Sequence, residues 1–203
     1  MIAERPDHAL HLTRSEAIVL FDWLAREIGE RQAANLSSAL VHVSEFWALN
    51  ALFGVLEKTL AEPFGHGWRS ALASARAELT PEETSLEIVP AGSERDPLPA
   101  ATVNSPGDRD SCATSLVLPA PETLILFEFL CREIDERDGA NMLDSFVSPA
   151  EFWALNAVQN VLEPGEFYAV MRDYREQVEE VRARVAGDQT GTFLRLQIKG
   201  RES

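Results

Sequence analysis

Apolar and polar positions follow the same order in two stretches of the chain, residues 10–57 and 116–163. Aligned at a constant offset of 106 positions, the two stretches share 24 identities in 48 positions without a gap. The longest identical run is Glu-Phe-Trp-Ala-Leu-Asn-Ala, at residues 45–51 and again at 151–157. Self-similarity at a fixed period is the signature of repeated structural units. The chain therefore contains two copies of one unit.

Each copy begins with a pattern that predicts an amphipathic helix. In the first copy, five apolar residues recur at helical spacing: Ala17, Leu20, Phe21, Leu24 and Ile28. Such spacing places them in one stripe on a helix. Thr13 and Glu16 have the spacing of a capping box, and Pro121 stands where the first turn of the second copy begins. We predict first helices over residues 15–32 and 121–138.

Short alternating patterns predict strands at both ends of each unit. Apolar and polar residues alternate at 10–12 and 116–118, before the first helices. They alternate again at 85–89 and 192–198, where we expect a closing strand in each unit.

The identical run predicts a second helix in both copies. Ser148 and Pro149 form a start signal, in which Glu151 folds back onto a backbone amide, and Glu45 is expected to do the same. A more divergent third helix is predicted at about 67–79 and 166–186.

Two pairs of asparagines stand at equivalent places in the copies. Asn35 and Asn141 follow the first helix, where asparagine tolerates a left-handed backbone and can end a helix. Asn50 and Asn156 lie in the middle of the second helix, although asparagine is a mediocre helix former. Their amides need hydrogen-bond partners, from the protein or from a bound partner.

These elements define the domain organisation. Residues 8–89 form the first unit and residues 116–199 the second, each with a strand, three helices and a strand. Residues 90–115, which contain four prolines, form a linker between them. We predict a mainly helical α+β fold in which the two copies pack with pseudo-twofold symmetry, because a unit of this size has little core of its own.

Charge and composition exclude several classes of function. The formal net charge is −15, and the chain has no cluster of lysine and arginine of the kind that direct nucleic-acid binding requires. No apolar run approaches the roughly 20 residues of a membrane span, and no signal peptide is visible. We expect a cytoplasmic protein in which Cys112 and Cys131 are free thiols.

Arginine and glutamate stand four residues apart in both copies, a spacing that predicts solvent-exposed ion pairs. The pairs are Arg26 with Glu30, Glu27 with Arg31, Arg132 with Glu136, and Glu133 with Arg137. An alternative is that Glu27 and Glu30, and likewise Glu133 and Glu136, bind Mg²⁺. That spacing is similar to the acidic helix of the all-α nucleotide pyrophosphohydrolases of the MazG type.

The sequence lacks a nucleophile motif and a duplicated histidine site, so we assign no catalytic residue and no cofactor. We expect a non-enzymatic acidic protein that neutralises or regulates a protein partner, as an immunity protein or antitoxin does. A basic partner, such as a toxin that acts on nucleic acid, would suit the charge. The alternative is a small Mg²⁺-dependent nucleotide hydrolase. The candidate partner-binding residues are Trp47, Asn50, Trp68, Trp153, Asn156 and Tyr168.

Overall fold

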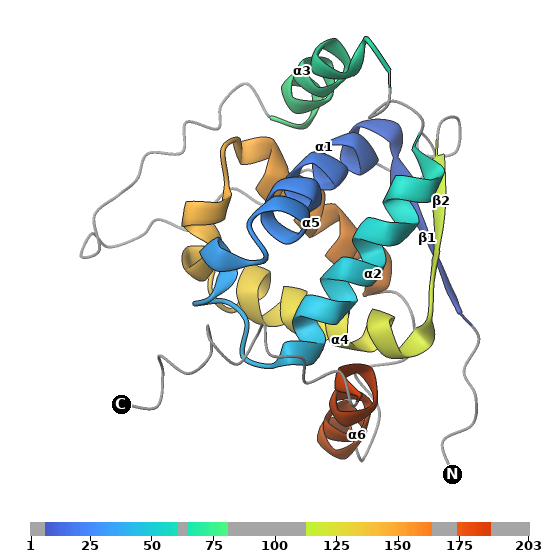
Figure 1. The fold of residues 1–203 in the computed structure, drawn as a ribbon, viewed down its shortest axis with the longest axis vertical. Coiled ribbons are helices and arrows are strands. Elements are labelled where there is room, and N and C mark those ends of the chain that lie inside the picture. The colour runs from blue at the N-terminus through green and yellow to red at the C-terminus, as the bar shows by residue number, and fades with distance from the viewer. Residues whose placement is uncertain (1–6, 61–64, 81–112, 164–173, 188–203) are drawn as a thin grey trace.

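The computed structural model describes residues 7–60, 65–80, 113–163 and 174–187, and it is mainly helical with one small sheet. The predicted helical character is therefore confirmed. In Figure 1 the long helices lie together in the centre, and the two strands lie along one side.

The sheet has two antiparallel strands, β1 (His8–Thr13) and β2 (Ala113–Leu118). Both were predicted, but β2 begins within the predicted linker, and the two strands pair with each other. Leu10 pairs with Leu116, its equivalent in the second copy. Alternate leucines of both strands, including Leu12 and Leu118, are buried on one face. The sheet therefore joins the two units.

The first predicted helix of each unit is an α-helix that changes into a π-helix. The segments are α1 (Arg14–Leu24) with η1 (Ala25–Glu30), and α4 (Ala120–Leu130) with η5 (Cys131–Asp135). Thr13 and Glu16 form the predicted capping box. In the π segments the backbone bond spans five residues, as from Arg31 N to Arg26 O. The predicted first helices are therefore present over most of their length, and their last parts are π-helical. π turns of this kind recur at functional places in helices.

The chain leaves each π-helix through two residues with a left-handed backbone. These are Gln32 and Ala33 in the first unit, and Asp138 and Gly139 in the second. Asn35 and Asn141, which we expected to end the helices, lie in the 3₁₀ helices that follow, η2 (Ala34–Leu36) and η6 (Ala140–Ser145). The left-handed turn comes earlier because the backbone N–H groups of Ala33 and Gly139 close it on the carbonyls of Glu27 and Glu133.

The remaining helices complete two similar sets. They are α2 (Val43–Thr59) and α3 (Trp68–Leu79) in the first unit, and α5 (Pro149–Leu162) and α6 (Tyr174–Ala186) in the second. Helix α1 lies beside α5, and α2 lies beside α4 (Figure 1). Helix α3 packs on α1 and α5, whereas α6 packs on α2 and α4. Every first or second helix therefore contacts the other unit.

One hydrophobic core runs through both units. Trp23 of α1 and Phe129 of α4 are its largest fully buried side chains. The predicted closing strands, at 85–89 and 192–198, lie outside the described residues, as do most of the predicted linker and the predicted start of the last helix at 166. Among the described helices, none combines the length and apolar character needed to cross a membrane.

Candidate functional site

Four glutamates within the described residues are completely buried. They are Glu27 and Glu133 in the π-helices, and Glu45 and Glu151 in the first turns of α2 and α5. Burying an ionised carboxylate is very costly unless it is paired and hydrogen-bonded. The groups that neutralise these four carboxylates therefore define the most unusual chemical feature of the molecule.

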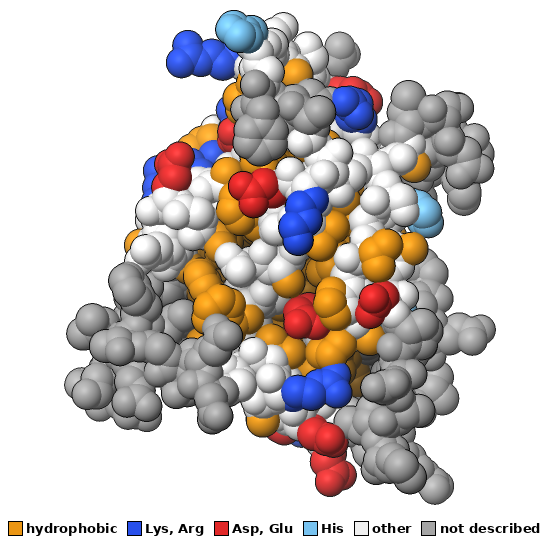
Figure 2. Space-filling model, turned by 45° about the vertical axis from the view of Figure 1, so that its right-hand side comes forward, with side chains coloured by type: hydrophobic (Ala, Val, Ile, Leu, Met, Phe, Trp, Pro, Cys, Tyr) orange, Lys and Arg blue, Asp and Glu red, His pale blue; other side chains and the backbone are white. Residues whose placement is uncertain are grey.

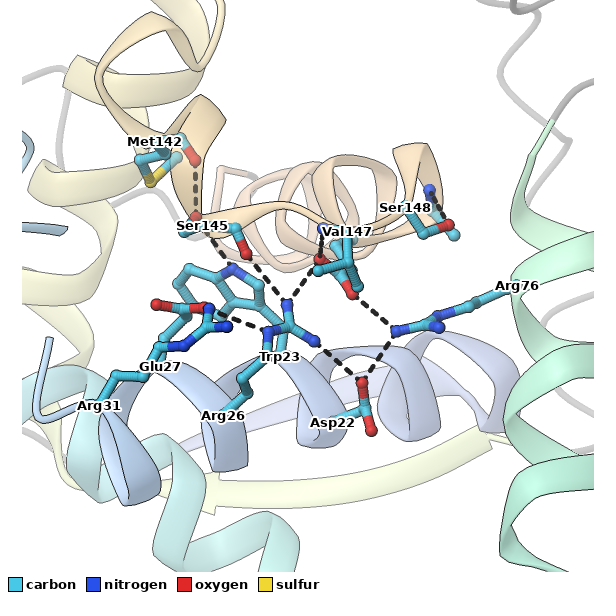
Figure 3. Close-up of polar contacts among 12 residues, drawn as sticks. Asp22, Trp23, Arg26, Glu27, Arg31, Arg76, Met142, Ser145, Val147 and Ser148 are labelled. Carbon is cyan, nitrogen blue, oxygen red and sulfur yellow. Dashed lines mark hydrogen bonds and ion pairs between the residues drawn. The ribbon is translucent and has the colours of Figure 1, made fainter. Parts of the chain in front are cut away.

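Glu151 receives hydrogen bonds from three donors. The donor residues Arg26, Arg76 and Val147 are labelled in Figure 3. Arg26 of η1 donates from Nη2 to Oε2 over 2.8 Å, and Arg76 of α3 donates from Nη2 to Oε1 over 2.8 Å. The backbone N–H of Val147 completes the set at 2.9 Å. The two guanidinium groups come from the first unit, so this carboxylate holds the units together. Asp22 lies on their other side and pairs with both arginines.

Glu45 has the equivalent set of partners, with its two guanidinium groups supplied by the second unit. Arg132 makes a two-pronged contact with the carboxylate at 2.8 and 3.0 Å, Arg182 approaches to 3.4 Å, and the N–H of Val41 donates over 2.9 Å. Each donor lies 106 positions from the corresponding donor at Glu151. The arginines also donate to backbone carbonyls across the interface, Arg26 to that of Ser145 and Arg132 to that of Ala39. These carbonyls are likewise 106 positions apart.

Glu27 and Glu133 accept bonds from arginines of their own units. Arg31 and Arg137 approach their Oε1 atoms to 2.6 Å, which confirms the predicted pairs four residues apart. Their predicted exposure was wrong, since both carboxylates are buried. Arg26 was expected to pair with Glu30, but it bridges Glu27 and Glu151 instead. A buried carboxylate attracts a guanidinium more strongly than an exposed one, because the surrounding dielectric is lower.

Arg132 differs from its prediction in the same way. Its expected partner was Glu136, but its guanidinium bridges Glu45 and Glu133. Glu136 itself is exposed at the surface.

The proposed Mg²⁺ ligands occupy two different environments. Glu27 and Glu133 are buried against guanidinium groups, whereas Glu30 and Glu136 are exposed. Within the described ranges, no three or more side chains of His, Cys, Asp or Glu form a group that could hold a metal ion.

The electrostatic surroundings of Arg26 and Arg132 favour their charged forms. Burial by itself lowers the pKa of Arg26, but its hydrogen bond and attraction to Glu151 outweigh burial, so its pKa is raised above the usual value. The pKa of Arg132 is raised in the same way by Glu45. Both guanidinium groups therefore stay charged at any physiological pH and remain paired with buried carboxylates of the other unit.

The predicted partner-binding tryptophans are half-buried, and each packs on a phenylalanine of its own unit. Trp47 contacts Phe46 edge to face with ring centroids 5.3 Å apart, and Trp153 repeats this with Phe152 at 5.6 Å. Trp68, another of the candidates, is half-buried with its ring centroid 5.7 Å from that of Phe21. The three candidate tryptophans therefore lie on three different helices, α2, α3 and α5.

The other candidates are polar. Asn50 and Asn156 are half-buried, and Oδ1 of Asn156 accepts a hydrogen bond from Asn160 one turn later. Tyr168 lies outside the described residues.

Sequence reasoning missed three participants in the interface. Arg76 and Arg182 were not selected, although their separation of 106 is the repeat offset and could have found them. The third is the buried hydrogen bond from Trp23 Nε1 to Ser145 Oγ, 3.2 Å long. It has no counterpart at the equivalent place across the interface, where Phe129 of the second unit and Ala39 of the first unit stand, so the repeat could not reveal it.

Fold and site together define a mainly helical protein whose two related segments are locked by reciprocal Arg–Glu contacts. Comparison of the chain with protein-family models, curated proteins and solved structures gave no match.

Proposed function

We propose that this protein is a non-enzymatic acidic binding protein that neutralises or regulates a protein partner, in the manner of an immunity protein or antitoxin. One observation carries the proposal: ionic groups that both repeats share form a network of pairs within and between the units. Six arginines and five acids pair in this network, so their charges nearly cancel. The formal net charge of −15 therefore belongs to the rest of the chain.

Part of that surplus lies on the second unit. Asp135, Glu136, Asp138 and Asp144 are exposed there, around the end of η5 and the start of α5. The equivalent residues of the first unit are Gly29, Glu30, Gln32 and Ser38, of which one is acidic. This difference favours a basic partner, such as a toxin that acts on nucleic acid, because complementary charge speeds association.

Hydrophobic side chains are available for the same contact. Leu143 and Val147 are each 59% exposed and flank the acidic Asp144 in sequence. Val41, the equivalent of Val147, is 44% exposed. Figure 2 shows that hydrophobic side chains also reach the surface between separated charged groups on the face seen there. Protein interfaces commonly combine an apolar centre with a polar rim.

The proposal includes a pseudo-twofold arrangement of the two units. It is supported by the pairing of the equivalent residues Leu10 and Leu116 in the sheet. It is also supported by the reciprocal contacts of Arg26 with Glu151 and Arg132 with Glu45. Contacts of this kind are expected when a duplicated unit keeps an isologous interface.

We further propose that the protein acts in the cytoplasm. Cys131 is a free thiol. Burial and, next, the charge of Asp135 raise its pKa to about 12, so the thiol stays protonated and unreactive at neutral pH.

The experiment is affinity capture from the native cell with the wild-type chain, followed by binding kinetics with the captured protein. One triple variant removes acids of the second unit: Glu136→Gln, Asp138→Asn and Asp144→Asn. A matched control removes three exposed acids on helices α2 and α6, away from this acidic group: Glu57→Gln, Glu176→Gln and Glu180→Gln. We expect the first variant to associate about 10-fold more slowly at low salt, with little change in dissociation, because steering acts on encounter.

Salt is the second arm of this experiment. The difference between wild type and variant should vanish at high ionic strength, because the Debye length falls from about 8 Å at 0.15 M to about 3 Å at 1 M. An association rate that does not depend on salt would contradict electrostatic steering. Turnover of a nucleotide by the purified chain in Mg²⁺ would contradict the non-enzymatic function itself.

A further inference from the structure

Among the described residues, the contacts that join the two units are made by strands and side chains of the units themselves. They include the β1–β2 pairing and the ion pairs of Arg26, Arg76, Arg132 and Arg182. The same contacts form whether the two units belong to one chain or to two. We propose that a second copy of this chain is a binding partner, with residues 8–79 of each chain assembling on residues 113–186 of the other.

The buried carboxylates Glu45 and Glu151 are neutralised by arginines of the other unit, so each unit is stabilised by pairing with the other. Without the second unit, Glu45 loses both Arg132 and Arg182. Without the first unit, Glu151 loses both Arg26 and Arg76. A carboxylate placed at such a site is unfavourable without its cation. An opened chain therefore closes again on itself or captures the matching unit of a neighbour.

The side chains also decide which units pair. Trp23 of the first unit donates its indole N–H to Ser145 of the second. If two first units paired, Trp23 would face Ala39, which stands at the position of Ser145 and has no hydroxyl. The buried indole N–H would then lack its acceptor, which is costly. Exchange between unlike units is thus favoured over pairing of like units.

Concentration sets the balance between the closed monomer and the exchanged dimer. The closed monomer benefits from the effective concentration of its own second unit, for which we take the order of 1 mM that is typical of units linked in one chain. At about 10 µM the exchanged form should therefore be roughly 100-fold rarer than the monomer, and near 1 mM the two should be comparable. Refolding a mixture of two chains makes the exchange observable.

The test uses a disulfide that reports which chain supplies each strand. Ala9 and Val117 are directly opposite in the sheet, and both are exposed. Paired residues of antiparallel strands lie about 4.5–5.5 Å apart at Cα, within the range of a disulfide. One full-length chain carries Ala9→Cys and the other Val117→Cys, with Cys112 and Cys131 replaced by serine in both. They are unfolded, mixed, refolded over a range of concentrations and oxidised.

We expect a covalent dimer of twice the 22.5 kDa chain mass. The ratio of this dimer to the monomer should increase roughly 100-fold between about 10 µM and 1 mM. A single chain with both cysteines is the positive control and should form its disulfide as a monomer. A mixture of Ala9→Cys and His11→Cys chains tests pairing of two first units. His11 stands at the position of Val117, the partner of Ala9 in the sheet, so Ala9 would face His11 in such a pair. This mixture should give no dimer above background.

Three results would overturn the proposal. The first is the absence of interchain disulfide at about 1 mM while the double-cysteine chain closes normally. The second is failure of the double-cysteine chain to close, since the strand pairing would then be wrong. The third is an equally strong dimer in the mixture that contains His11→Cys, since exchange would then lack the selectivity assigned to Trp23 and Ser145.

Discussion

At the scale of single residues, Glu45 and Glu151 show how one side chain can serve two purposes. Each was predicted to fold back onto a backbone amide at the start of its helix, and each does so, at Val41 and Val147. Each carboxylate also pairs with two arginines of the other unit. A carboxylate at a helix N-terminus is favoured by the helix dipole, which offsets part of the cost of burial.

His42 provides a prediction at this scale. Its Nδ1 caps α2 by accepting the N–H of Ser44 at 3.2 Å. Burial, and next the charge of Arg182, lower the pKa of His42, whereas Glu45 and Glu179 act in the opposite sense. The folded state therefore disfavours the protonated ring. The stability tied to His42 should be fully present above about pH 6.5, the ordinary pKa of histidine, and should be lost as the pH falls through the lower folded-state pKa.

The measurement compares wild type with His42→Ser, since serine caps the equivalent helix at Ser148. Unfolding free energies from urea titrations at pH 8 and pH 5.5 should show the wild type losing stability relative to the variant as the pH falls. The remaining histidines are common to both proteins and cancel in the difference. Parallel pH profiles for the two proteins would contradict a role for His42.

At the scale of elements, the π-helices and the left-handed turns that follow them distinguish this fold from a simple helix pair. They occur at equivalent places in both units. Each turn ends with a different residue, Ala33 at φ 61° and Gly139 at φ 71°. A left-handed backbone costs an L-residue about 1–2 kcal/mol, and glycine avoids this cost. The first unit therefore tolerates strain that the second avoids.

Two single substitutions, alanine at position 139 and glycine at position 33, should change the free energy of unfolding by unequal amounts. Gly139→Ala should lower the free energy of unfolding by about 1–2 kcal/mol, from backbone strain and from a Cβ only 3.1 Å from the Phe152 ring. Ala33→Gly should be nearly neutral, because relief of strain is offset by loss of a buried methyl, about 0.8 kcal/mol, and by a more flexible unfolded chain. Urea denaturation of both variants provides the comparison. Equal and opposite effects would show that the Phe152 contact and the buried methyl are unimportant.

At the scale of the whole molecule, the two units share a core, a sheet and reciprocal ion pairs, so neither has a complete interior alone. Such coupling should make them unfold together. We predict one cooperative transition, with the calorimetric enthalpy equal to the van't Hoff enthalpy. Two separate transitions would indicate that each unit is stable without the other.

Glu151→Gln tests the same coupling. It removes the charge that neutralises Arg26 and Arg76, and breaking a buried pair typically costs 3–5 kcal/mol. Because the side chains of these arginines are 14% and 28% exposed, we expect the lower end, about 3 kcal/mol, with the transition still single. Glu136→Gln, at an exposed position, should leave the midpoint unchanged. A selective loss of only one unit's near-ultraviolet signal would contradict the shared interface.

The sequence by itself determined the features that depend on nearby residues. The amphipathic stripes, the capping box at Thr13, the start signal at Ser148 and the two strands that precede the first helices were predicted and are present. They could be predicted because hydrophobic period and capping act over a few residues. The duplication was visible for the same reason, since it requires only the order of residues.

Only the tertiary structure decided which charges are buried and what they contact. Glu27 and its equivalent were predicted to be exposed, because a pattern of Glu and Arg four residues apart does not distinguish a solvated helix face from one covered by another unit. Arg132, which pairs with Glu45, lies 87 positions away in the chain. Arg26, which pairs with Glu151, lies 125 positions away. The cost of an unpaired buried charge imposes these contacts, and that cost exists only after the two units have packed and excluded water.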